Sequence, residues 1–166
     1  MEETPVQGES PSALVERLAR AKASAIAGRQ PQAWVIGSDQ VAVLDLGGMQ
    51  TVLGKPGTDA RCQEQLRACS GRTVEFLTAV ALMRRDSEQL IEFTDITRVA
   101  FRLLDEPTIA RYVAKERPLD CAGGFKSEGL GIALCEAIDS ADPSALIGLP
   151  LIRLSAALRS AGFELP

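Results

Sequence analysis

Residues 73–102 read TVEFLTAVALMRRDSEQLIEFTDITRVAFR, and this stretch decides the fold class. Residues 73–83 are rich in Val, Thr, Leu and Phe, which favours a long strand, and residues 90–102 continue in the same style. The polar residues 84–89 between them connect the two runs. Two long strands that follow each other so closely predict a sheet as the centre of the protein.

Helical and extended segments alternate on both sides of this pair. Ser10-Pro11 is typical of a helix start, apolar residues recur at helical spacing over 11–27, and Gly28 ends the pattern. Further helices are expected at residues 58–69, 105–115 and 142–161, and further strands at 33–37, 41–44, 51–53 and 131–136. This alternation predicts an α/β protein with a mixed, twisted sheet flanked by helices. At 166 residues the chain is long enough for one domain with its own core, and we expect a single domain over residues 1–166.

The composition limits the classes of function. The net charge is −4 with no run of Lys and Arg, which argues against a general binder of nucleic acid or membrane surfaces. The sequence shows no signal peptide and no apolar run long enough to span a bilayer, so we expect a cytoplasmic protein. The chain has no His, which excludes a His-dependent triad. Its four cysteines form no Cys-x-x-Cys pair, which favours reduced thiols over a zinc site.

The stretch DCAGGFKSEGLG, residues 120–131, is the most informative for function. Its paired glycines let the backbone approach a ligand closely or adopt a positive φ. Lys126 and Glu128 offer a cation and an anion that share one side of an extended chain. Such a loop can hold a polar, ring-shaped ligand beside a phosphate. A glycine-rich turn with solvated charges is the alternative.

Two further residues are candidates for chemistry. Asp39 follows the strand expected at 33–37, and ligands of open α/β sheets collect outside the carboxyl ends of strands. It is a candidate metal ligand or general base, against the alternative of a turn-forming Asp. Lys55, in the sequence LGKP, can place a cation on a phosphate, but no Walker motif surrounds it and a solvated lysine is the alternative.

Some charged residues fit a solvated surface better. Lys22 and Arg17 lie on the first expected helix, where periodicity alone favours a surface position. Glu2, Glu3 and Glu9 are candidates for a divalent metal, although an acidic terminus is more often simply solvated.

Taken in chain order, these fragments resemble the Maf family of nucleotide pyrophosphatases. The resemblance covers nearly the whole chain and is therefore more specific than any one motif. The matching stretches are residues 3–5 (ETP), 8–9 (GE), 18–19 (LA), 22–23 (KA), 36–41 (IGSDQV), 53–56 (LGKP), 70–71 (SG), 76–78 (FLT), 112 (Tyr), 118–132, 142–143 (DP) and 147–150 (IGLP).

The resemblance implies a Maf fold, related to the inosine triphosphate pyrophosphatases. It implies hydrolysis of a nucleoside triphosphate between the α and β phosphates, with a divalent cation such as Mg²⁺, Mn²⁺ or Co²⁺. Asp39 matches the family's general base and is expected to bind the metal, and Lys22 and Lys55 match its lysines near the phosphates. A nucleotide is therefore the expected partner, and a homodimer is left open.

The glycine-rich stretch indicates the subfamily. FKSEG, residues 125–129, resembles the branch that prefers 7-methyl-GTP, whereas the dTTP/UTP branch typically has YGIQG. Methylation at N7 gives the purine a positive charge, which the carboxylate of Glu128 can compensate. Gln40 and Glu128 match positions linked to substrate choice. A nucleotide-binding or septum-regulating module with little turnover is an alternative, and so is a dTTP/UTP enzyme, which Lys126 and Glu128 disfavour.

The start of the chain departs from the family pattern. Family members usually begin with a strand and a Ser-x-Ser-Pro-x-Arg-Arg segment that opens a helix, and this sequence starts after that unit. Relative to the family we therefore expect an N-terminally truncated domain that lacks this strand–helix unit and its arginine and helix N-terminal contacts to phosphate.

Overall fold

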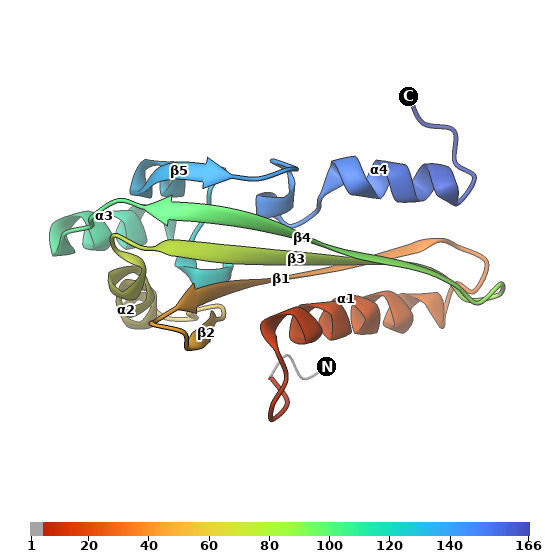
Figure 1. The fold of residues 1–166 in the computed structure, drawn as a ribbon, viewed down its shortest axis with the longest axis horizontal. Coiled ribbons are helices and arrows are strands. Elements are labelled where there is room, and N and C mark those ends of the chain that lie inside the picture. The colour runs from red at the N-terminus through yellow and green to blue at the C-terminus, as the bar shows by residue number, and fades with distance from the viewer. Residues whose placement is uncertain (1–4) are drawn as a thin grey trace. The chain divides into compact units, whose positions relative to one another are not determined.

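The structure, a computed structural model, describes residues 5–166 (Figure 1). Its helices and strands are α1 (Pro11–Ala27), β1 (Val35–Asp45), β2 (Gln50–Leu53), α2 (Asp59–Cys69), β3 (Thr73–Arg84), β4 (Gln89–Phe101), α3 (Glu106–Glu116), β5 (Cys135–Asp139) and α4 (Leu151–Ser160). Short 3₁₀ turns lie at Ala122–Gly124, Leu130–Leu134 and Ala145–Ile147.

The strands form one five-stranded sheet in the order β2-β1-β3-β4-β5. β1 pairs antiparallel with β2, with Ala42 opposite Leu53, and β4 pairs antiparallel with β5, with Arg98 opposite Asp139. The arrows of neighbouring strands alternate in direction in Figure 1. The predicted α/β class, with a sheet flanked by helices, is confirmed, but the sheet is antiparallel and not mixed.

Contacts divide the chain into two compact units. The first unit comprises the described residues up to Gln40, Leu77–Ile96 and Ala141–Pro166, and the second comprises Val41–Phe76 and Thr97–Ser140. The chain passes from one unit to the other within β1, β3 and β4, and again after β5, between Ser140 and Ala141. The expectation of a single domain stays a prediction.

In the first unit, α1 packs unusually closely on β1. Ser10 caps the helix by accepting a hydrogen bond from the backbone N–H of Ala13 (3.2 Å). A Cβ atom added to Gly37 of β1 would lie 2.3 Å from the carbonyl oxygen of Ala19 and 2.5 Å from the nitrogen of Ala23. Only glycine therefore allows this approach between helix and strand. The approach fixes which residues of α1 face β1.

In the second unit, three aromatic rings build the core. The ring of Phe125 lies 5.6 Å from that of Phe76 and 5.1 Å from that of Phe101, measured between centroids. Phe125 belongs to the glycine-rich stretch, so the loop is anchored through its own aromatic residue. Cys62 and Cys69 are buried, and burial raises the pKa of their thiols to about 11 and about 12. At neutral pH they are protonated and act as small apolar residues.

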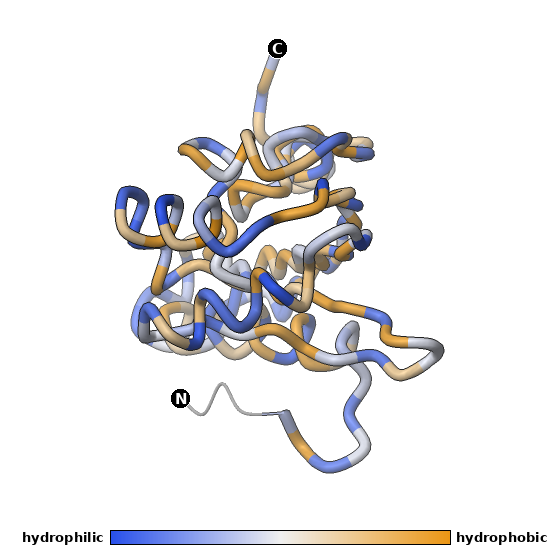
Figure 2. The backbone as a smooth tube through the Cα atoms, turned by 90° about the vertical axis from the view of Figure 1, so that its left-hand side faces the viewer, coloured by the Kyte–Doolittle hydropathy of each residue, from blue (hydrophilic) through white to orange (hydrophobic). Residues whose placement is uncertain are grey.

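Hydrophobic and hydrophilic residues alternate at short intervals along the chain (Figure 2). Within residues 5–166, no helix combines the length and the apolar character that crossing a membrane requires.

Two strands differ from those predicted. β1 runs unbroken through residues 38–40, where the polar sequence predicted an interruption, because the side chains of Ser38 and Gln40 find hydrogen-bond acceptors inside the first unit. The strand predicted at 131–136 begins only at Cys135, because the preceding residues form a tight 3₁₀ turn. A Cβ atom added to Gly131 in that turn would lie 2.3 Å from the carbonyl oxygen of Lys126.

Candidate functional site

The first unit brings two of the predicted site residues together. Lys22 of α1 forms an ion pair with the carboxylate of Asp39 in β1. The side chain of Asp39 is 10% exposed and that of Lys22 34%, so solvent screens this pair only in part. Asp39 lies inside a strand, not in a turn, and Lys22 is not merely a solvated surface charge. The close packing at Gly37 brings α1 within reach of this carboxylate.

Gln40 lies next to Asp39, but its amide group bonds to protein atoms. Its Nε2 donates to the hydroxyl of Thr78 (2.8 Å) and to the carbonyl oxygens of Ala145 (3.0 Å) and Leu146 (3.2 Å). All three acceptors belong to the first unit. The amide N–H groups of Gln40 are therefore directed at Thr78 and at the chain's own segment 145–146.

The second unit holds the glycine-rich stretch in place through a buried tyrosine. The backbone N–H of Lys126 donates to the hydroxyl of Tyr112 (3.0 Å), which in turn donates to the carbonyl oxygen of Gly124 (3.1 Å). Tyr112 is 4% exposed, and burial raises the pKa of its hydroxyl. The hydroxyl therefore stays protonated and can serve as donor and acceptor at once. In the sequence Tyr112 stood out only as part of the family resemblance.

Glu116 fixes the charged end of the same stretch. Its carboxylate accepts a hydrogen bond from the backbone N–H of Leu130 (2.7 Å) and pairs with Nζ of Lys126 (3.1 Å). The bond from Leu130, followed by that from Lys126, lowers the pKa of Glu116, and Glu116 raises the pKa of Lys126. Glu128 is exposed at the surface of the loop. No pattern in the sequence pointed to Glu116.

We expect Glu116→Gln to loosen this loop in a pH-dependent way. Because the folded-state pKa of Glu116 is lowered, its charge stabilises the fold fully above the ordinary pKa of 4.5, and this stabilisation is lost as the pH falls through the folded value. The variant should therefore unfold at a lower temperature than the wild type at pH 7, and the difference should shrink as the pH falls below 4.5. Thermal unfolding of both proteins across this range checks the prediction, which a pH-independent difference would contradict.

Lys55 lies on a segment bound to the glycine-rich stretch within the second unit. The backbone N–H of Gly123 donates to the carbonyl oxygen of Gly54 (3.2 Å), and that of Gly57 donates to the carbonyl oxygen of Leu119 (2.9 Å). The side chain of Lys55 is exposed. The structure thus brings the segments of Lys55, Lys126 and Glu128 together in one unit, and it brings Lys22, Asp39 and Gln40 together in the other.

Of the metal ligands predicted from the sequence, Asp39 is suited to bind a divalent cation. Among residues 5–166, no group of three or more His, Cys, Asp or Glu side chains is placed to hold a metal ion. Mg²⁺ often binds one or two carboxylates and completes its coordination shell with water and substrate phosphates. The carboxylate of Asp39 suits this mode of binding. Glu9 instead pairs with Arg17 (2.7 Å), and this bond, with one from the Val6 N–H, lowers its pKa to about 2. The suggested ligands Glu2 and Glu3, and Thr4 of the family resemblance, lie outside the described residues.

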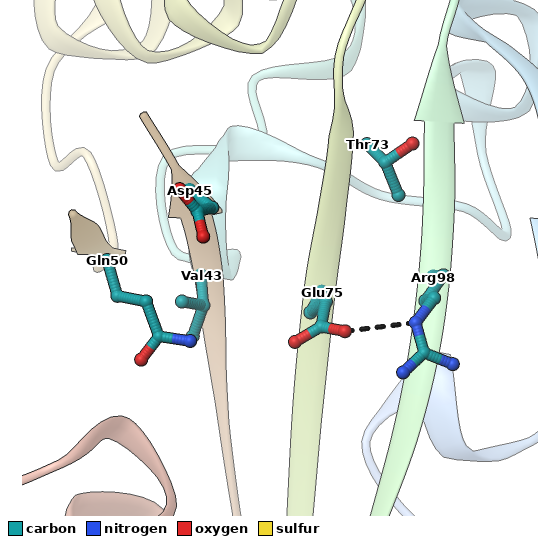
Figure 3. A pocket seen from close by; sticks show the side chains of 6 residues that line it. All are labelled: Val43, Asp45, Gln50, Thr73, Glu75 and Arg98. Atoms are coloured by element: carbon teal, nitrogen blue, oxygen red, sulfur yellow. Dashed lines mark hydrogen bonds and ion pairs between the residues drawn. The ribbon is translucent and has the colours of Figure 1, made fainter. Parts of the chain in front are cut away.

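A polar pocket lies on the sheet of the second unit, and none of the predicted site residues lines it (Figure 3). It has a volume of about 390 Å³ and is lined by Val43, Asp45, Gln50, Thr73, Glu75 and Arg98. Glu75 and Arg98 point toward one another across neighbouring strands and form an ion pair of 2.9 Å. This pair neutralises much of the charge in the pocket.

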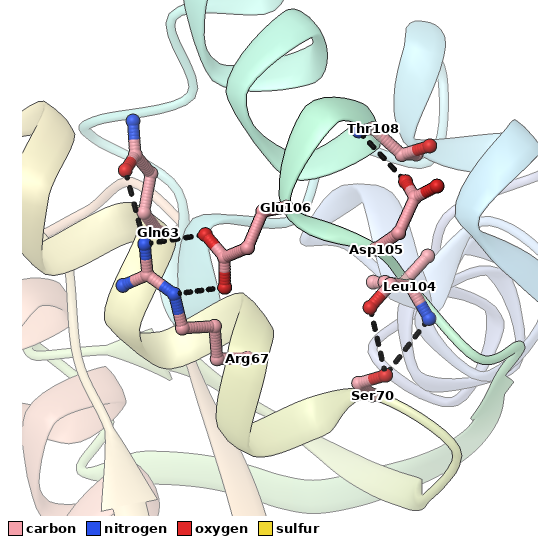
Figure 4. A network of polar contacts seen from close by, with 7 residues as sticks. All are labelled: Gln63, Arg67, Ser70, Leu104, Asp105, Glu106 and Thr108. Atoms are coloured by element: carbon pink, nitrogen blue, oxygen red, sulfur yellow. Dashed lines mark hydrogen bonds and ion pairs between the residues drawn. The ribbon is translucent and has the colours of Figure 1, made fainter.

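A second polar network joins α2 to α3 (Figure 4). Arg67 binds both carboxylate oxygens of Glu106 (2.6 and 2.8 Å), and the hydroxyl of Ser70 accepts a hydrogen bond from the backbone N–H of Leu104 (2.8 Å). Asp105 caps α3 by accepting from the backbone N–H of Thr108 (2.9 Å). Ser70, one of the residues in the family resemblance, therefore has a structural role in these contacts.

Known proteins resemble this chain over nearly its whole length. The family described as Maf-like protein matches residues 1–161. A 7-methyl-GTP pyrophosphatase of Xanthomonas oryzae pv. oryzae (strain MAFF 311018) is 57% identical over 166 residues, which are 100% of this chain and 84% of that protein. Proteins of the same name from Alkalilimnicola ehrlichii and Pseudomonas aeruginosa are 56% and 52% identical, over 91% and 96% of this chain and 74% and 81% of their own lengths.

Proposed function

Because this chain belongs to the Maf-like protein family, we propose that it is a nucleoside triphosphate pyrophosphatase. Its substrate is 7-methyl-GTP or a similar modified nucleotide, and its products are the monophosphate and pyrophosphate. The observation that carries this proposal is the identity of 52–57% to proteins named 7-methyl-GTP pyrophosphatase, over at least 91% of the chain. The ion pair of Lys22 with Asp39 and the anchored glycine-rich loop support it.

Asp39 is the general base in this proposal. Its carboxylate accepts the proton of the attacking water, and the ion pair with Lys22 holds it in place. Lys22 and Lys55 neutralise charge on the triphosphate and on the leaving pyrophosphate, because phosphoryl transfer depends more on positioning and charge stabilisation than on covalent steps. Asp39 would also supply a ligand to a divalent cation. When bound, the cation would neutralise phosphate charge and lower the pKa of water.

In this proposal Lys126 and Glu128 select the nucleobase of the substrate. Lys126 forms its ion pair with Glu116, and the carboxylate of Glu128 lies exposed in the same loop. A carboxylate in this position can compensate the positive charge of a purine methylated at N7, which unmethylated GTP lacks. The bases of dTTP and UTP, the substrates of the alternative enzyme, carry no such positive charge for a carboxylate to compensate.

We expect Glu128→Gln to reduce selectivity for 7-methyl-GTP over GTP. The substitution removes the charge with little change of shape. The ratio of the two kcat/KM values should therefore fall about 10- to 150-fold. This factor corresponds to a free energy of about 1.5–3 kcal/mol, the magnitude of one charge-assisted contact. Glu136→Gln, at another exposed glutamate of the second unit, is the matched control. An unchanged ratio in Glu128→Gln would place the discrimination elsewhere.

Pyrophosphate release from a panel of nucleotides tests the proposal as a whole. The panel comprises 7-methyl-GTP, GTP, dTTP and UTP, each with Mg²⁺, Mn²⁺ or Co²⁺. We expect 7-methyl-GTP to give the highest kcat/KM. Preferred cleavage of dTTP and UTP would favour the other branch, and binding without release would favour the low-turnover or septum-regulating module.

The proposal includes the setting of the enzyme. A small nucleotide substrate and a net charge of −4 favour a cytoplasmic enzyme that binds neither nucleic acid nor membranes. A homodimer is compatible with it.

A further inference from the structure

The two residues that flank Asp39 are both attached to the same distant segment. The hydroxyl of Ser38 lies 2.7 Å from the carbonyl oxygen of Gly148 and 3.0 Å from that of Ala79. The amide nitrogen of Gln40 lies 3.0 Å from the carbonyl oxygen of Ala145. The contacts with Ala145 and Gly148 span 105 and 110 residues of the chain, and all three contacts lie within the first unit.

A fully buried hydroxyl completes the attachment. Thr78 of β3 accepts a hydrogen bond from Gln40 (2.8 Å), and its hydroxyl lies 3.0 Å from the carbonyl oxygen of Ala145, to which it donates. Thr78 is 0% exposed, so its side chain cannot touch a substrate. Any effect of Thr78 on the reaction must therefore pass through other residues.

The segment that accepts these bonds is itself held firmly. Asp142 is 2% exposed, and its carboxylate accepts hydrogen bonds from the backbone N–H groups of Ser144 (3.0 Å) and Ile152 (2.6 Å). Burial acts to raise the pKa of Asp142, but the hydrogen bonds led by that from Ser144 outweigh it, and the net pKa is lowered. Asp142 therefore stays ionised at neutral pH and ties the segment to the first turn of α4.

The position of Asp39 follows from strand geometry. Successive side chains of a strand point to opposite faces, so Ser38 and Gln40 point away from the side on which Asp39 meets Lys22. Bonds on both flanking residues restrict the rotation of β1 about its own axis at this point. The direction of the Asp39 carboxylate is thereby restricted as well.

We propose that Ser38, Gln40 and Thr78 form a latch that positions Asp39 against Lys22. The three are positioning residues, and the inference rests on the proposed role of Asp39 in the hydrolysis. The inference gives Gln40 a role other than recognising the nucleobase of the substrate. An amide has two N–H protons, and three protein acceptors lie within 3.2 Å of the Gln40 nitrogen, so no donor is left for a substrate.

Thr78→Val tests the latch, because it removes the hydroxyl and keeps the shape. We expect kcat to fall roughly 10- to 100-fold, the scale of a small misplacement of a reacting group. The loss should be equal for 7-methyl-GTP and GTP, with little change in KM, and Thr78→Ser should restore the rate. Thr97→Val is the matched control, since Thr97 is also 0% exposed and bonds to the hydroxyl of Ser140 (2.9 Å) in the second unit. We expect it to keep the wild-type kcat.

Two kinetic outcomes would overturn the inference. A folded Thr78→Val protein with the kcat of Thr97→Val would show that the hydroxyl of Thr78 does not position Asp39 for the reaction. A Gln40→Ala protein with a changed preference between 7-methyl-GTP and GTP would show that Gln40 reads the base. Equal losses for both nucleotides in Gln40→Ala would support the latch.

A cycle of unfolding measurements keeps the latch separate from the proposed function. Thermal midpoints are compared for the wild type, Thr78→Val, Lys22→Met and the double variant. If the latch positions Asp39 for Lys22, the losses are not additive, because Thr78→Val has already weakened the ion pair. If the wild type cleaves no nucleotide, the proposed function fails, and additive losses in this cycle would then overturn the latch on their own.

Discussion

Asp39→Asn should lower kcat for 7-methyl-GTP by on the order of 10²- to 10⁴-fold, the usual contribution of a positioned acid–base group. Asparagine keeps the size of the side chain but cannot accept the proton of the attacking water. It also leaves the ammonium group of Lys22 without the carboxylate it faces in the structure. Initial rates of pyrophosphate release at saturating nucleotide measure the effect.

A second aspartate of the same strand is the matched control for this variant. Asp45 is exposed in β1, and Oδ1 of its carboxylate accepts a hydrogen bond from the backbone N–H of Gly48 (2.6 Å). Asp45→Asn can keep that bond through its amide oxygen, and we expect its kcat to stay near the wild-type value. A folded Asp39→Asn protein with near-normal kcat would remove Asp39 from the mechanism.

Gly37→Ala should be the most damaging single-atom addition to the first unit. The new methyl group would meet the carbonyl oxygen of Ala19 at 2.3 Å and the nitrogen of Ala23 at 2.5 Å. These are backbone atoms of a helix and cannot turn aside, so α1 must shift as a whole. We expect a loss of about 3 kcal/mol in unfolding free energy, the upper end of typical overpacking, and a thermal midpoint lower by about 6–12 °C.

The same variant should also lower kcat, because α1 carries Lys22 and its shift would separate Lys22 from Asp39. Gly28→Ala is the control: Gly28 has helical backbone angles, and an added Cβ there meets only the carbonyl oxygen of Ser24, at 3.5 Å. We expect that variant to match or exceed the wild-type stability. Equal stability of Gly37→Ala and Gly28→Ala would contradict the close packing of α1 on β1.

Local rules were enough to predict most helices. The start of α1 follows from Ser10-Pro11, and α2 begins where Thr58 caps it, because caps depend only on neighbouring residues. The continuity of β1 could not be predicted in this way. Ser38 and Gln40 are tolerated inside the strand because carbonyl groups 105 to 110 residues further on accept their hydrogen bonds.

The candidate site, too, could be predicted only where neighbouring residues in the sequence are sufficient, and not where tertiary contacts decide. The sequence pointed to Asp39 as chemically competent, but periodicity alone placed Lys22 on the surface. Their pairing depends on the tight approach at Gly37, which is a tertiary contact. Glu116 was missed because a glutamate near a helix end is ordinary, and its importance comes from Lys126 and Leu130 of a separate loop.

The products formed from 7-methyl-GTP test the central claim most directly. Phosphorus NMR of the reaction with a divalent cation should show 7-methyl-GMP and pyrophosphate in equal amounts, without orthophosphate. The Asp39→Asn protein should leave the nucleotide nearly intact over the same time. Release of orthophosphate with a nucleoside diphosphate, or an intact nucleotide with the wild type and each of Mg²⁺, Mn²⁺ and Co²⁺, would contradict the account.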